Sequence, residues 1–146
     1  MVISLLPNKL GRDFVVGDIH GCYDEFECLL SRVKFDSTKD RVISVGDLID
    51  RGKDSVSCIK LLDKPWFYIV LGNHEQAILD WYQSHDRVTQ ETYERKLLHN
   101  GSSWFLALSV KQQQQIYNKL KSLPRLYLSI ITINYIVFCM QKLFLK

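Results

Sequence analysis

The sequence predicts an α/β fold whose core is a βαβαβ unit with a parallel sheet, followed by an antiparallel hairpin. Two observations favour this fold. Short apolar runs alternate with segments whose apolar residues recur at helical spacing. Three of these runs lead into Asp18, Asp47 and Asn73, which lie 29 and 26 residues apart, close to the roughly 30 residues of one strand–helix–strand crossover.

Strands and helices alternate in the first half of the chain. From Phe26 to Val33, apolar residues recur at i, i+3, i+4 and i+7, which is one face of a helix. Pro65 ends the next helix, because proline cannot continue one. The expected order is a strand at 14–16, a helix through 26–33, a strand at 41–45, a helix through 56–62, a strand at 66–71 and a helix that starts near His74.

The second half of the chain is more polar. Ser109 and Gln112 form a predicted capping box at the start of a helix, and Pro124 follows the end of that helix. The length of the chain favours one domain that spans residues 1–146. The expected elements are a helix at 91–99, a loop at 100–103, a helix from 110 to 121, and a hairpin of strands 126–131 and 135–139 that turns around Asn134.

The composition argues against several classes of function. A net charge of +3 without a cluster of Lys and Arg gives no sign of nucleic-acid binding. Residues 126–145 are apolar but carry too many polar side chains for a transmembrane helix, and residues 1–13 lack a secretion signal. The four cysteines form no CxxC pair and no zinc spacing, so we expect reduced thiols in a cytoplasmic protein.

Three short motifs follow the three strands and carry side chains suited to chemistry. They are GDIHG at 17–21, GDLIDRG at 46–52 and GNHE at 72–75. In open α/β sheets, ligands bind at the carboxyl ends of the strands, where all three motifs fall. We expect Asp18, His20, Asp47 and Asn73 to hold two divalent metal ions, with Asp47 as the bridge. Mixed oxygen and nitrogen ligands suit Mn²⁺, Fe²⁺ or Zn²⁺, and two such ions can clamp a phosphate and generate hydroxide from bound water.

Four residues are candidates for the chemistry of the substrate. Arg51 and Asn73 are the candidate phosphate-binding residues, since the planar fork of Arg51 matches two phosphate oxygens. His74 follows a metal ligand and can act as a general acid toward the leaving oxygen. Asp50 can accept the other ring proton and so fix the orientation of His74.

Other prominent residues are expected to be structural. Glu75 falls in the first turn of a helix, where the helix dipole favours a carboxylate. The tryptophans Trp66, Trp81 and Trp104 are large apolar side chains, and we expect them in the core.

The motif triplet GDIHG, GDLIDRG and GNHE resembles the PPP family of metallophosphatases, with their calcineurin-like fold. Residues 12–139, including the LGNHEQ and HNGSSWF segments, further resemble bacterial and phage-lambda-type serine/threonine protein phosphatases. The resemblance implies Mn²⁺ as the activating ion and phosphorylated serine or threonine, sometimes tyrosine, in a protein or peptide as substrate. It implies a first metal ion on Asp18, His20 and Asp47, a second on Asp47 and Asn73, a phosphate contact from Arg51, and proton donation by His74 with support from Asp50.

Symmetrical diadenosine tetraphosphate hydrolases are the nearest competing branch. They share GDxHG and the Gly-Asn-His motif, but they tend to lack the second Asp of GDxxDRG and to carry Asp after Asn-His. This chain has Asp50 and Glu75 at those positions. The resemblance therefore favours a protein phosphatase that attacks a phosphomonoester with metal-bound hydroxide.

The sequence departs from the family pattern near its C-terminal end. After Tyr-Ile-Val-Phe-Cys the family continues with a His that binds the second metal, whereas Met140 and Gln141 follow Cys139 here. A further ligand His and a phosphate-binding Arg are expected beyond this point. We therefore expect the C-terminal part of the fold to be missing, the second metal site to be incomplete and residues 140–146 to be an out-of-frame tail. An inactive, truncated remnant is the third interpretation.

Overall fold

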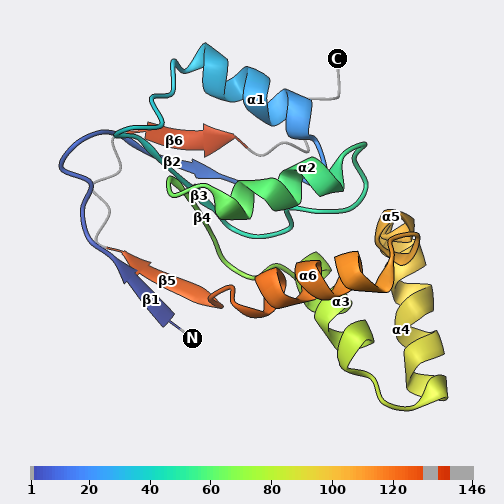
Figure 1. Ribbon diagram of the computed structural model, residues 1–146. Coiled ribbons are helices and arrows are strands. Elements are labelled where there is room, and N and C mark those ends of the chain that lie inside the picture. The colour runs from blue at the N-terminus through green and yellow to red at the C-terminus, as the bar shows by residue number, and fades with distance from the viewer. Residues whose placement is uncertain (1, 130–134, 139–146) are drawn as a thin grey trace.

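The computed structural model contains two parallel sheets and describes residues 2–129 and 135–138 (Figure 1). The predicted turn at Asn134 and the predicted tail at 140–146 lie outside the described residues. The elements in chain order are β1 (Val2–Leu5), β2 (Asp13–Val16), α1 (Tyr23–Arg32), β3 (Arg41–Ser44), α2 (Ser55–Lys60), the 3-10 turn η1 (Leu61–Asp63), β4 (Phe67–Ile69), α3 (Asn73–Gln83), α4 (Arg87–Asn100), α5 (Ser103–Leu106), α6 (Val110–Lys121), β5 (Leu126–Ser129) and β6 (Tyr135–Phe138).

The larger sheet has four parallel strands in the order β4-β3-β2-β6. Val16 at the end of β2 pairs in register with Ser44 at the end of β3, and Ser44 pairs with Ile69 at the end of β4. The carboxyl ends of these three strands therefore lie level with one another. The predicted βαβαβ unit is confirmed, and the three motifs start from one edge of the sheet.

The predicted antiparallel hairpin is wrong. β5 pairs in parallel with β1, where Val2 lies opposite Leu126, and β6 pairs in parallel with β2, where Phe14 lies opposite Tyr135. The two strands thus belong to different sheets. Apolar runs indicate where strands form but not which strands pair. β1, which no sequence pattern predicted, supplies the partner of β5.

The helix α4 is longer than the predicted segment 91–99. It starts earlier because Asp86 caps it by accepting a hydrogen bond from Thr89 N at 2.8 Å. Gly101 ends it in the left-handed conformation, with φ of 93°. The predicted loop at 100–103 leads directly into α5, so the change of direction is confined to a short turn.

The helix α6 starts at the predicted capping box. Ser109 Oγ accepts a hydrogen bond from Gln112 N at 3.4 Å, and Gln112 Oε1 accepts one from Ser109 N at 3.1 Å. The helix ends at Lys121, as predicted, and Pro124 follows it. Among the described residues, no helix has both the length and the apolar character needed to cross a membrane.

A hydrophobic core joins the sheet to its helices. Figure 1 shows α1 and α2 against the four-stranded sheet, while α3, α4, α5 and α6 gather beside it. Phe26 of α1 meets Phe67 of β4 edge to face, with ring centroids 5.9 Å apart. Trp81 of α3 meets Phe105 of α5 in the same way at 5.8 Å. The first contact joins α1 to the sheet, and the second joins α3 to α5 within the other helical group.

A buried ion pair holds the turn before β3. Asp40 is 2% exposed and accepts hydrogen bonds from Arg12 N at 2.8 Å and Arg12 Nη2 at 2.6 Å. Asp36 N donates to the same carboxylate at 3.0 Å. Burial raises the pKa of Asp40, but the hydrogen bonds from Arg12 and Asp36 outweigh it, so the pKa lies below its usual value.

We predict that Asp40→Asn destabilises the fold at pH 7 by about 1–3 kcal/mol, because Arg12 loses its buried counter-charge. A lowered folded-state pKa means that this stabilisation is complete above about pH 4 and is lost as the pH falls through that pKa. Urea unfolding at pH 7 and pH 3 measures both effects. Asp24→Asn, at an exposed position on α1, is the control. An equal loss at the two pH values would contradict the prediction.

Candidate active site

The loops after β2 and β3 are joined by backbone hydrogen bonds. Ile19 N and His20 N donate to Asp47 O at 3.1 and 2.9 Å, and Gly52 N donates to His20 O at 2.8 Å. Gly52 has no room for a side chain, because a Cβ would lie 2.2 Å from His20 O. The first two motifs therefore form one unit at the edge of the sheet.

The backbone of this unit is strained where the candidate side chains stand. His20, Asp47, Asp50 and Arg51 have φ of 47°, 52°, 72° and 65°, all in the left-handed region. Such conformations cost about 1–3 kcal/mol each and persist only where surrounding contacts enforce them. Strain of this kind concentrates at functional sites, which agrees with the position of the motifs.

Glu75 holds the backbone of the loop after β3 in its strained conformation. Its buried carboxylate accepts four backbone hydrogen bonds, two on each oxygen. Oε2 accepts from Asp47 N and Gly72 N, both at 3.0 Å, and Oε1 accepts from Leu48 N at 2.9 Å and Ile49 N at 3.3 Å. Burial and the nearby Asp47 charge raise the pKa of Glu75 to about 7, against the effect of these N–H groups. Glu75 does lie in the first turn of α3, as predicted, but sequence reasoning missed that it organises the preceding motif.

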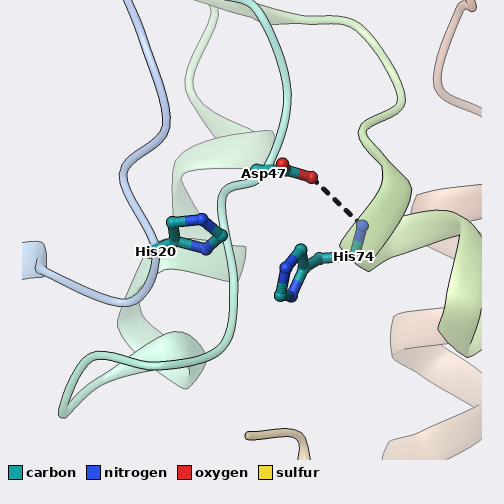
Figure 2. Close-up of side chains that lie close together, drawn as sticks. All are labelled: His20, Asp47 and His74. Atoms are coloured by element: carbon teal, nitrogen blue, oxygen red, sulfur yellow. Dashed lines mark hydrogen bonds between the residues drawn. The ribbon is translucent and has the colours of Figure 1, made fainter. Parts of the chain in front are cut away.

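His20, Asp47 and His74 form a compact group, with one nitrogen or oxygen of each within 4.8 Å of the others. Figure 2 shows the two imidazole rings near each other, below the Asp47 carboxylate. His20 Nδ1 lies 2.9 Å from Ile49 O, so Nδ1 carries a proton and Nε2 keeps its lone pair. Among the described residues, buried His20 Nε2 has no hydrogen-bond partner. Burial lowers the pKa of His20 and outweighs the Ile49 carbonyl, so the ring is neutral at pH 7.

Asp18 and Asn73 flank this group. Asp18 Oδ2 lies 3.8 Å from His20 Nε2. The side-chain amide of Asn73 faces the Asp47 carboxylate, and its nitrogen, turned toward Asp47, donates to Oδ2 at 2.9 Å and Oδ1 at 3.3 Å. An unpartnered imidazole nitrogen and carboxylates that converge in this way fit a divalent cation, to which each would donate a lone pair.

His74 differs from His20 because both of its ring nitrogens have partners. Nδ1 lies 2.8 Å from Asp50 Oδ2, and Nε2 lies 3.3 Å from Arg51 Nη2. The backbone N of His74 donates to Asp47 Oδ1 at 3.1 Å, so the start of α3 is tied to the second motif. The ring is 1% exposed, whereas Arg51 reaches solvent. This arrangement orients the ring for proton transfer and leaves it no free lone pair for a metal ion.

Two further residues, both missed from the sequence, contact Asp50. Ser102 Oγ donates to Asp50 Oδ2 at 2.7 Å, and Trp104 Nε1 donates to Asp50 Oδ1 at 2.8 Å. Trp104 packs against the core as expected, but its ring is only partly buried and its N–H points to the site. The HNGSSWF segment was the one signal that could have found them. All the side chains singled out in the three motifs, in contrast, meet at this edge of the sheet.

Comparison with known proteins points to one family. The sequence matches the family model of calcineurin-like phosphoesterases over residues 14–138. It is 44% identical over 102 residues to serine/threonine-protein phosphatase 1 of Salmonella typhimurium, which covers 70% of this chain and 44% of that protein. It is 42% identical over 71 residues to the symmetrical bis(5'-nucleosyl)-tetraphosphatase of Cellvibrio japonicus, which covers 47% of this chain and 26% of that protein.

A solved structure extends the likeness to the fold. It belongs to a protein assigned provisionally as a diadenosine tetraphosphatase and matches with a TM-score of 0.63 and 31% identity. The match covers 88% of this chain and 49% of that chain. The present chain thus spans less than half the length of the curated relatives that it matches.

We predict that the chain binds Mn²⁺ and that Asp47→Asn weakens this binding by more than about tenfold. Loss of a residue that only hydrogen-bonds to a metal ligand already weakens metal binding by about tenfold or more, and Asp47 is proposed to be a ligand itself. The decrease of the free-ion electron paramagnetic resonance signal on titration measures the affinity. Asp63→Asn, an exposed aspartate that pairs with Lys119, is the matched control. Equal affinity in the Asp47 and Asp63 variants would rule out the proposed ligand set.

We also predict that Glu75→Gln destabilises the fold by about 2–3 kcal/mol, because the amide presents its own N–H groups to two of the four backbone donors. Thermal unfolding followed by circular dichroism measures the change. Glu91→Gln, on the exposed side of α4, is the control. A difference of less than about 0.5 kcal/mol between the two variants would refute the role given to Glu75.

Proposed function

Because the chain belongs to the calcineurin-like phosphoesterase family, we propose that it is a metal-dependent phosphatase that acts on phosphoserine and phosphothreonine in proteins or peptides. The observation that carries the proposal is the position of His74 between Asp50 and Arg51, beside the candidate metal ligands. The likeness to the Salmonella phosphatase, over 70% of this chain, adds support for the substrate class. A cytoplasmic location is part of the same proposal.

Divalent ions bound at this site would polarise the phosphate and activate a water molecule. Asp18, His20, Asp47 and Asn73 are the proposed ligands, and their mixed nitrogen and oxygen donors suit Mn²⁺. His20 is suited to this role because its Nε2 lone pair is free while Ile49 O holds the other ring nitrogen. A carbonyl that fixes a ligand imidazole in this way is a common feature of metal sites.

Arg51 and Asn73 are the proposed phosphate-binding residues. The Arg51 side chain reaches solvent, and its guanidinium lies at His74 Nε2, so a phosphate bound to Arg51 lies next to the ring. With Arg51 on the phosphate, His74 Nε2 faces the leaving oxygen, and the imidazolium form of the ring can deliver its Nε2 proton while it keeps the proton on Nδ1. Asp50 accepts from Nδ1 and so prevents the ring from turning this nitrogen away.

A symmetrical diadenosine tetraphosphate hydrolase is the second candidate. The observation in its favour is the solved structure with 31% identity over 88% of this chain. The phosphatase is preferred because the curated phosphatase aligns with 70% of this chain and the curated tetraphosphatase with 47%. The two activities differ in substrate and can be separated directly.

We predict Mn²⁺-dependent hydrolysis of a phosphoserine peptide with kcat/KM at least roughly tenfold above that for diadenosine tetraphosphate, a ratio that differential transition-state binding readily provides. Release of phosphate and separation of nucleotides by chromatography measure the two rates. His74→Asn should lower kcat by about 10²–10³ because the general acid is lost, while His85→Asn at an exposed position should not. Preference for the dinucleotide would favour the second candidate. A folded chain that binds Mn²⁺ and cleaves neither substrate would be an inactive remnant.

A further inference from the structure

Asp50 is held by side chains from outside the three motifs. Ser102 lies in the short turn between α4 and α5, and Trp104 lies in α5 itself, 52 and 54 residues beyond Asp50 in the sequence. The carboxylate is 0% exposed, and so is Ser102. Oδ2 is shared between the His74 ring and Ser102, and Oδ1 is taken by Trp104. Each oxygen of the carboxylate therefore has at least one partner.

The segment that carries these donors, from Gly101 into α5, is fixed in place. Gly101 lies against the second motif so closely that a Cβ would come within 3.0 Å of Arg51 N. Ser102 N donates to Leu97 O at 2.9 Å, which closes the end of α4. Phe105, 0% exposed, anchors the following residues in the core. The two donors thus stand on a rigid support rather than on a free loop.

The consequence for the carboxylate is a fixed orientation. Rotation of the Asp50 carboxylate about its Cβ–Cγ bond would break the contact with Trp104 at one oxygen or with Ser102 at the other. Hydrogen bonds to a charged acceptor inside a protein are strong and directional. The oxygen that faces His74 Nδ1 is therefore kept in line with the ring, and the proton stays on Nδ1.

We propose that Ser102 and Trp104 are positioning residues that orient His74 through Asp50. The catalytic part of this inference rests on the proposed phosphatase function, whereas the effect on the imidazole proton does not. A structural role alone would require only the bulk of the indole and the small volume of the serine side chain. Trp104→Phe keeps an aromatic ring and removes the N–H, and Ser102→Ala removes only the hydroxyl, so the two variants separate positioning from packing.

The kinetic test compares aryl phosphates with good and poor leaving groups in the Mn²⁺-loaded chain. Each variant should lower kcat by about tenfold with little change in KM. A loss of this size is typical when a residue that hydrogen-bonds to an active-site group is removed. The loss should be larger for phenyl phosphate than for p-nitrophenyl phosphate, because the poorer leaving group depends more on proton donation. Trp66→Phe, at the opposite end of the sheet, and Ser103→Ala, at an exposed neighbouring position, are the matched controls.

The second readout does not depend on activity. Nitrogen-15 nuclear magnetic resonance of the imidazole groups should show His74 in the wild type with its proton on Nδ1 and slow exchange of that proton. Trp104→Phe and Ser102→Ala should each speed the exchange and populate the other tautomer, while the two controls should not.

Variants with a wild-type Nδ1 proton signal would overturn the proposal. So would an equal kinetic loss for both leaving groups. A wild-type chain without hydrolytic activity would count against the proposed function, and the proton signal alone would then decide whether Ser102 and Trp104 position His74.

Discussion

The carboxylate of Glu75 accepts four backbone N–H groups, and this contact joins the first turn of α3 to the loop after β3. The loop needs such an acceptor, since Asp47 has a left-handed backbone and three successive N–H groups point inward. This buried carboxyl group offsets the cost of that conformation by accepting the hydrogen bonds of all these N–H groups. Asp47 thereby lies close to His20 and His74, and its Oδ1 accepts the backbone N–H of His74. Both the candidate metal ligands and the candidate acid depend on this one side chain.

Two groups of polar side chains meet at the strand ends, and they differ in whether their polar atoms already have hydrogen-bond partners. On one side, His20 Nε2 has no hydrogen-bond partner among the described residues, and the Asp18 carboxylate lies 3.8 Å from it. These groups are arranged to receive a cation from outside. On the other side, His74 and Asp50 have partners on both nitrogens and both oxygens. A side chain whose polar atoms all have hydrogen-bond partners is held in one orientation, and a group that transfers a proton requires such a fixed orientation.

A feature of this structure could be predicted from the sequence when the residues that form it lie close together in the chain. The βαβαβ unit and the motif residues followed from local apolar runs and from the rule that strand ends meet at one edge. The strands that pair with β5 and β6 could not be predicted in this way, because strand pairing is decided by contacts between residues far apart in the chain. The sequence also did not reveal the roles of Glu75, Ser102 and Trp104, since all their partners in the second motif lie 26 to 54 residues away and carry no periodic signal. Trp104 in particular looks like any core aromatic until its N–H is seen to point at Asp50.

The strand pairings also dictate an order of assembly. Val2 lies opposite Leu126 and Phe14 opposite Tyr135, so each outer pairing closes a loop of nearly the whole described chain. Closure on that scale carries a large entropic cost and slows folding. The pairings of β2 with β3 and β3 with β4 need only the intervening crossovers, so they are available while later residues are still being synthesised. The nascent chain can therefore form the three strands that carry the site motifs before β5 is available to pair with β1 and β6 with the outer edge of β2. During that interval these exposed edges are a target for chaperones and a hazard for aggregation.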